Sequence, residues 1–296
     1  MATLLEQGLK RDEPTELVVV GRRRGPGIER VLMYLLLIII AIFFIAPLIV
    51  LISTSLKYKA EIVQDTGIIP LDPGLENYQQ LFSGGINFLK SFTNSAIVAT
   101  VGTVLTVALT SLSAYAFARI DFPLKNALFS LLITTLLLPG VMFLVPQAKL
   151  IGQTGLYDTL PAFILPGLAG VFGVFFMRQF FLGIPVELEE AAYVDGADRF
   201  TTFRRIILPL TGPAMATLSV ITFLAYWNDY LWPAVVCNQN CTLPPALRQL
   251  QGQFKSTDDY GLVLAGAVVA AIPVLIFYML AQRHIVQSVT SSGVKG

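Results

Sequence analysis

Charged residues are scarce in this chain. Asp, Glu, Lys and Arg make up 13% of its 296 residues, whereas about 25% is usual in soluble domains. A soluble protein needs a polar surface, and this chain can barely supply one. The composition therefore argues against an ordinary soluble domain. The formal net charge of +1 gives no reason to expect a nucleic-acid partner.

Histidine and cysteine are scarcer still. The one histidine, His284, is far in the sequence from the two cysteines, Cys237 and Cys241. Common zinc sites need more ligands of these types than the chain supplies, so we predict no metal site. An enzyme would need a nucleophile–base pair or a set of metal ligands, and the sequence offers neither. It also lacks a Gly-x4-Gly-Lys-Ser/Thr phosphate loop. We expect a chain without catalytic residues and without a cofactor of its own.

Long apolar runs are abundant, since hydrophobic residues make up 55% of the chain. The apolar core of a bilayer is about 30 Å thick, so a spanning helix needs about 20 apolar residues. Six segments meet this requirement: Val31–Ile52, Phe92–Ala118, Ala127–Gln147, Thr159–Met177, Pro213–Val236 and Leu262–Ala281. We predict an all-α fold, a polytopic membrane protein with six transmembrane helices.

The first apolar run follows a cluster of arginines, as a secretory signal peptide would. It is longer than the roughly 7–15 residues of a signal core, and no small-residue cleavage site follows it cleanly. We interpret residues 31–52 as a retained first span, preceded by a cytoplasmic tail at residues 1–30.

The basic residues indicate the orientation. Most of the 20 Lys and Arg lie in the two termini and in the loops after the second and fourth spans. Because cytoplasmic loops are rich in Lys and Arg, we expect both termini in the cytoplasm. Residues 53–91 then form an external loop with a short helix near Glu76–Phe82. Residues 92–283 form a core of five spans, and residues 284–296 form a cytoplasmic tail.

The two cysteines fall in a predicted external loop, where an oxidising environment permits a disulfide. A bridge between Cys237 and Cys241 would close over only three intervening residues, which is geometrically tight. A disulfide and two free thiols both remain open.

The cytoplasmic stretch 185–209, between the fourth and fifth spans, is more polar than its surroundings. Pro185 suits the first position of a helix, and the glutamates that follow favour the positive end of the helix dipole. Leu188, Ala191 and Ala192 share one face at spacings of three and four. The alanines on that face leave room for a partner to approach closely.

A second short helix is predicted in the same stretch. Gly196 suits the left-handed residue that ends a helix. Asp198 is a good cap for the next helix, which Pro209 is expected to terminate. The pattern predicts a helix, a chain reversal and a second helix.

This stretch resembles the EAA loop of ATP-binding-cassette importer permeases, with every element at the family's spacing. The matching residues, with Asp195 beside the glycine, are Glu190, Ala191, Ala192, Gly196, Ile206, Leu208 and Pro209. The stretches 114–119, 227–229 and 293–296 are similar to the maltose-type branch, and within it to the shorter six-span subunit of a permease pair. Ser288 and Ser291 depart from the family, which has glycines there.

The resemblance implies a multi-pass subunit of the prokaryotic cytoplasmic (inner) membrane with four kinds of partner. These are a second homologous permease, two ATPase subunits that bind ATP and Mg, an external solute-binding protein and the lipid bilayer. An ATPase would hold the loop in a surface cleft, with Glu190 contacting a basic residue there. The branch implies an oligosaccharide or glycoside as substrate, with polyols and glycerol phosphate as alternatives. The first four spans carry no central charge, which disfavours an ion-coupled secondary transporter.

A polar and aromatic cluster near the outer end of the fifth predicted span is a candidate substrate path: Tyr226, Trp227, Asn228, Asp229 and Tyr230. Such a cluster is also typical of an aromatic belt at the membrane interface, and both interpretations stay open.

The second span carries a stripe of small residues that indicates either helix packing or a pathway lining: Ser95, Ala99, Gly102, Thr106, Thr110 and Ser113. Prolines and glycines in the third and fourth spans indicate kinks.

Overall fold

The structure is a computed structural model that describes residues 27–64, 67–84, 87–253 and 260–293. Every regular element in these ranges is helical and none is a strand, so the predicted all-α class is confirmed. The chain divides into two compact units, Met1–Leu48 and Ile49–Gly296.

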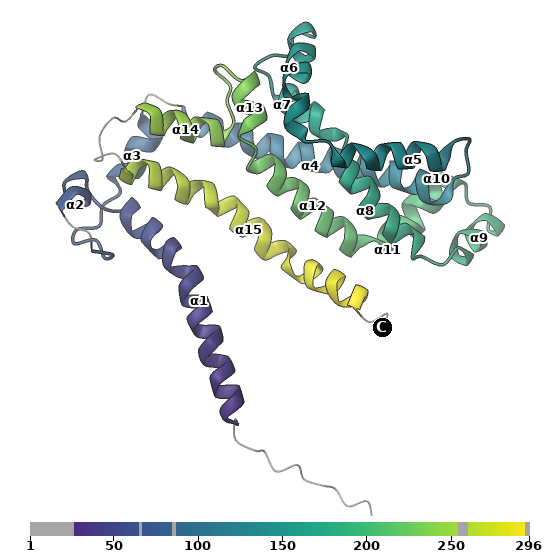
Figure 1. The fold of residues 1–296 in the computed structure, drawn as a ribbon, viewed down its shortest axis with the longest axis horizontal. Helices are drawn as coiled ribbons and strands as arrows, with labels where there is room; N and C mark the ends of the chain where they lie inside the picture. The colour runs from purple at the N-terminus through teal and green to yellow at the C-terminus, as the bar shows by residue number, and fades with distance from the viewer. Residues whose placement is uncertain (1–26, 65–66, 85–86, 254–259, 294–296) are drawn as a thin grey trace, which may run out of the picture. The chain divides into compact units, whose positions relative to one another are not determined.

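The helices follow one another along the chain as labelled in Figure 1. The α-helices are α1 (Ile28–Ser55), α2 (Lys59–Gln64), α3 (Glu76–Ser83), α4 (Phe88–Arg119), α5 (Lys125–Thr134), α6 (Leu144–Gln153), α7 (Leu160–Ile164), α8 (Val171–Leu182), α9 (Glu187–Val194), α10 (Arg199–Thr202), α11 (Leu208–Leu210), α12 (Gly212–Trp227), α13 (Leu231–Val236), α14 (Leu243–Gln253) and α15 (Tyr260–Gly293). Shorter turns are the 3₁₀ segments η1 (Thr135–Leu137), η2 (Gly140–Phe143) and η3 (Leu165–Leu168) and the π-helical segment η4 (Phe203–Ile207).

Three helices in the described ranges are long and apolar enough to cross a membrane alone. They are α1, α4 and the Tyr260–Leu280 part of α15, and they correspond to the first, second and sixth predicted spans. The short helix predicted near Glu76–Phe82 is present as α3.

The third, fourth and fifth predicted spans are not straight helices. Lys125–Leu137 and Gly140–Gln153 meet at 98°, and Leu160–Leu168 and Val171–Leu182 meet at 47°. These breaks coincide with Pro139 and Gly170, in the proline- and glycine-containing segments where kinks are predicted. Gly212–Val236 holds the fifth predicted span and meets the preceding segment at 80°. The number of spans is six if each bent pair crosses once.

Helix α4 lies at the centre of unit 2 and packs along both α8 and α12. Its small residues make this close approach possible. Ala99 and Thr110 are almost fully buried, and a Cβ atom at Gly173 of α8 would lie 3.1 Å from the Thr110 methyl group. The small-residue stripe of α4 is therefore a helix-packing face, except for Ser113, which is exposed.

Tyr226 of α12 stabilises this packing through contacts with two other helices. Its hydroxyl donates a hydrogen bond to the carbonyl of Ile164 and lies within hydrogen-bond distance of Thr106 Oγ1, each at 3.1 Å. Gly102 of α4 and Gly167 of η3 flank its ring, and neither leaves room for a side chain. One tyrosine thus joins α4, α7 and α12.

We expect Gly102→Ala to destabilise the protein by about 1–3 kcal/mol, the usual cost of overpacking a tight contact. A Cβ atom there would lie 2.8 Å from the Tyr226 ring. Gly152→Ala in α6 is the matched control, because a Cβ atom there meets nothing within 4 Å. Thermal unfolding in detergent measures both variants. Equal midpoints for Gly102→Ala and the wild type would contradict this account of the packing.

Candidate functional site

Helix α9 begins at Glu187, two residues after Pro185, so the predicted first position is corrected. The helix ends at Val194, and Gly196 follows with φ +85°, in the left-handed region predicted for it. The N–H of Ala197 bonds to the carbonyl of Ala192 at 2.9 Å and closes the helix end. A left-handed glycine thus reverses the chain here.

The Asp198 side chain caps α10 as predicted, accepting a hydrogen bond from the Thr201 N–H at 3.2 Å. Pro209, however, does not terminate the helix. It lies inside α11, which continues to Leu210 before the chain bends at Thr211. A proline ring normally clashes with the carbonyl four residues earlier. The wider π turn of η4, immediately before α11, leaves room for the ring.

The prediction that Leu188, Ala191 and Ala192 form a face of α9 open to a partner is wrong for Ala192. Ala192 is 6% exposed and packs inside the chain, so it is not available to a partner. The exposed face of α9 is made by Leu188, Glu190, Ala191 and Val194. The side chain of Glu190 makes no hydrogen bond or ion pair with any other residue in the described part of the chain. The residues predicted to meet a partner are thus divided between two faces.

The inward face of α9 carries a charged residue that the sequence reasoning missed. Glu189 is 3% exposed, and its Oε1 lies 2.8 Å from Arg119 Nε. This contact is an ion pair, because the Nε–H is not aligned with the oxygen as a hydrogen bond. The Tyr115 hydroxyl donates to Glu189 Oε2 at 2.9 Å. Nothing in the run of three glutamates distinguishes the buried one, since that depends on the helix phase relative to α4.

Arg119 also binds the end of α8. Its Nη2 donates to the carbonyl of Phe181 at 2.7 Å and to the carbonyl of Ile184. The last carbonyls of a helix have no partner within it, so Arg119 supplies one. One guanidinium therefore joins the ends of α4 and α8 to α9.

An aromatic cluster lies beneath these charges. Tyr115 contacts the rings of Phe181 and Phe203, with centroids 5.9 and 4.8 Å apart. Ile206 and Leu208, two residues of the EAA pattern, are partly buried against the same core. The second half of the segment is thus anchored by apolar packing, whereas Asp195, Gly196 and Pro209 are exposed.

The candidate path residues lie at the break between α12 and α13. Tyr226 and Trp227 serve packing, and Trp227 Nε1 donates to the carbonyl of Ala270 in α15 at 3.1 Å. Asp229 is half-buried, and its Oδ1 accepts the N–H of Trp232 at 3.3 Å. Asn228 and Tyr230 are exposed.

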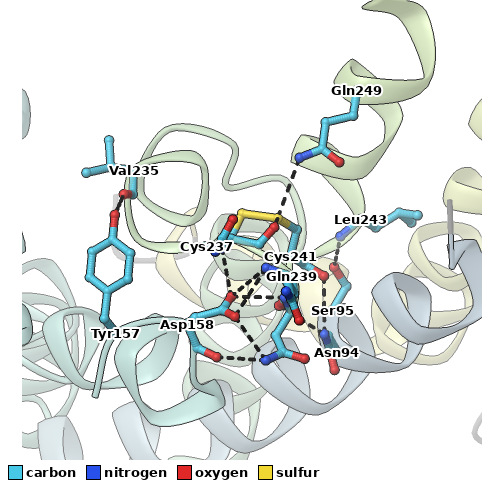
Figure 2. The surroundings of a disulfide bond; sticks show 12 residues. Asn94, Ser95, Tyr157, Asp158, Val235, Cys237, Gln239, Cys241, Leu243 and Gln249 are labelled. Atoms are coloured by element: carbon cyan, nitrogen blue, oxygen red, sulfur yellow. Dashed lines mark hydrogen bonds between the residues drawn. A yellow bond between two sulfur atoms is a disulfide. The ribbon is translucent and has the colours of Figure 1, made fainter. Parts of the chain in front are cut away.

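The loop after α13 is closed by a disulfide between Cys237 and Cys241, whose Cα atoms are 5.0 Å apart (Figure 2). The Asp158 carboxylate, from the α6–α7 connection, accepts N–H bonds from all three residues inside the ring. The donors are Asn238 at 2.7 Å, Gln239 at 3.1 Å and Asn240 at 2.9 Å. Two segments about 80 residues apart are thereby joined.

The N-terminal part of α4 holds the same loop from another side (Figure 2). Asn94 Nδ2 donates to the carbonyls of Asn240 and Cys241 at 3.0 and 3.2 Å. Ser95 Oγ accepts the N–H of Leu243 at 2.7 Å. Helix α4 therefore contacts this loop through one end and α9 through the other.

A family model described as "binding-protein-dependent transport system inner membrane component" matches residues 106–291. The match includes both the α9–α11 segment and the break between α12 and α13.

Curated relatives match nearly the whole chain. The arabinooligosaccharides transport system permease protein AraQ of Halalkalibacterium halodurans is 34% identical over 87% of this chain and 93% of its own. The trehalose transport system permease protein SugB of Mycobacterium tuberculosis is 33% identical over 86% of this chain and 93% of its own.

The fold matches a subunit in the crystal structure of a bacterial ABC transporter involved in the import of the acidic polysaccharide alginate. The TM-score is 0.77 at 24% identity, over 89% of this chain and 99% of that one. The bent helices thus belong to a known permease fold.

The hydrogen bonds from the disulfide loop to Asp158 make the free energy of unfolding depend on pH. Burial opposes ionisation of Asp158, but the N–H bonds from Asn238, Asn240 and Gln239 outweigh it and lower its pKa. A lowered folded-state pKa gives stability that is present above the unfolded pKa, about 3.9, and lost as pH falls through the folded pKa. We expect Asp158→Asn to be less stable than the wild type at pH 7.

The stability difference between the two proteins should narrow below about pH 4, as the wild-type carboxylate is protonated. Unfolding in detergent over this pH range measures it. A difference that stays constant down to about pH 3 would show that the charge on Asp158 contributes nothing.

Proposed function

This chain belongs to the family of binding-protein-dependent transport system inner membrane components, and we propose that it is one permease subunit of an ATP-binding-cassette importer for a sugar. The observation that carries the proposal is the α9–α11 segment, in which the family's spacing coincides with an exposed helix face and a left-handed glycine. Relatives named for arabinooligosaccharides, trehalose and lactose support the substrate class.

The exposed face of α9 is where an ATPase subunit binds. Glu190 faces away from its own chain and meets a basic residue in a cleft of the ATPase. ATP and Mg bind to two such subunits. When the two ATPase subunits close together, the membrane helices move between inward- and outward-facing states. A second, homologous permease completes the pathway, and an external solute-binding protein delivers the sugar.

We place six spans across the membrane, with both termini and the α9–α11 segment in the cytoplasm. The distribution of Lys and Arg supports this orientation. So does the disulfide loop at residues 237–241, which then lies on the oxidising side.

The sugar passes the break between α12 and α13, where Asn228 and Tyr230 are exposed. Tyr226 and Trp227 position this segment by packing, and Asp229 fixes the start of α13. The predicted spans contain no cluster of basic residues to neutralise a phosphate. A neutral oligosaccharide or glycoside is therefore favoured over glycerol phosphate.

We expect Glu190→Lys and Gly196→Asp to reduce sugar uptake by at least about tenfold while the chain remains in the membrane. The first variant places like charges across the interface, which costs several kcal/mol. The second puts a charged side chain at the exposed chain reversal. Gly155→Asp is the matched control, because Gly155 also has positive φ and open space around it but lies between α6 and α7.

Uptake into vesicles that contain the full complex measures the effect, with immunoblots for the amount of chain in the membrane. Wild-type uptake by both Glu190→Lys and Gly196→Asp would refute the assignment of the ATPase-binding segment.

A further inference from the structure

We propose that the ion pair between the buried Glu189 and the partly buried Arg119, with Tyr115, is a link through which movement of α9 reaches the membrane helices. This inference rests on the proposed function and deepens it. It assigns to Glu189, Arg119 and Tyr115 a positioning role in coupling that is separate from binding the ATPase.

The first argument is that α9 has two faces with different partners. Glu190 is exposed and points away from the chain, whereas the neighbouring Glu189 is buried against α4. When a partner holds the outer face of a helix, a displacement passes to the rest of the chain through the two chain connections of the helix and through the contacts of its inner face. On the inner face, Glu189 makes the ion pair to Arg119 and accepts the hydrogen bond from Tyr115, whose hydroxyl also interacts with Tyr193 of α9.

The second argument is that Arg119 reaches two membrane helices at once. It is the last residue of α4, and it bonds to the carbonyl of Phe181 in the last turn of α8 and to that of Ile184 just after this helix. A shift of Glu189 therefore acts on α4 and α8 together. These two helices pack along each other, so they would move as one body.

The third argument comes from the energetics of buried charge. Replacing both members of a buried ion pair with apolar residues is often neutral for stability, whereas removing one member is costly. Such a pair is therefore weak as a source of stability. Its geometry, with the carboxylate held by an arginine and by a tyrosine hydroxyl at 2.9 Å, fixes the position of α9 relative to α4.

The test separates coupling from folding by comparing sugar imported per ATP hydrolysed in proteoliposomes. The samples contain the full complex of both permeases, both ATPases and the binding protein. The double variant Arg119→Met, Glu189→Leu removes both charges and keeps apolar bulk. We expect it to assemble and hydrolyse ATP while sugar imported per ATP falls by at least about fivefold, the lower range of coupling between sites.

The matched control is Arg178→Met. Arg178 also joins α8 to α4, through its Nε bond to the Phe117 carbonyl at 3.1 Å and its position 4.2 Å over the Phe129 ring. It makes no contact with α9 among the interactions of the described residues. We expect sugar imported per ATP to be unchanged in this variant.

Tyr115→Phe is the second probe, because it keeps the ring packing and removes only the hydroxyl interactions with Glu189 and Tyr193, both of which lie on α9. If the double variant does not accumulate in the membrane, Tyr115→Phe alone tests whether the pair couples α9 to the membrane helices. We expect a severalfold lower ratio of sugar to ATP with unchanged ATPase binding. A wild-type ratio of sugar imported to ATP hydrolysed in the double variant would overturn the inference. If the double variant does not accumulate, a wild-type ratio in Tyr115→Phe would overturn it.

Failure of the proposed function gives a different result. In that case the wild-type chain itself does not co-purify with ATPase subunits or does not import sugar, whatever the variants do.

Discussion

The close packing of α4 against α8 and α12 is the constraint on which unit 2 depends. Lipid provides no hydrophobic drive between helices, so membrane helices associate through tight packing of small residues and through hydrogen bonds. Helix α4 has both, with Ala99, Gly102 and Thr110 buried on one face and the Tyr226 hydroxyl beside Thr106. The bent segments α7–η3 and α8 follow this face, because Gly170 approaches it where a side chain would collide with Thr106 and Thr110, and Gly167 leaves room for the Tyr226 ring.

The same helix joins the two functional ends of the unit. Near its N-terminus, Asn94 and Ser95 hold the connection that contains the disulfide loop. At its C-terminus, Tyr115 and Arg119 hold α9. Because α4 is one continuous helix of 32 residues, the positions of its ends are mechanically linked. A permease that converts ATPase closure into opening toward the outside needs such a connection between its two faces.

The sequence predicts the straight helices well, because an unbroken apolar run of sufficient length has few alternatives. It also predicts Gly196 and Asp198, whose roles follow from local backbone chemistry. It does not predict the bend angles, or Pro209 within a helix, because these depend on how neighbouring turns satisfy the backbone. The burial of Glu189 and Ala192 depends on the rotation of α9 toward α4, which the run of glutamates does not encode. The sequence does not decide between a disulfide and two free thiols at Cys237 and Cys241, because Asp158, which organises their loop, is distant in the sequence.

The central claim is that the outer face of α9 lies in the cytoplasm under an ATPase subunit. Val194 is 88% exposed at the end of this face, so Val194→Cys with a membrane-impermeant thiol reagent tests the claim most directly. We expect labelling in inside-out vesicles stripped of the ATPase, no labelling in right-side-out vesicles, and protection when the ATPase is restored. Labelling from the outside, or labelling that the ATPase leaves unchanged, would contradict the account.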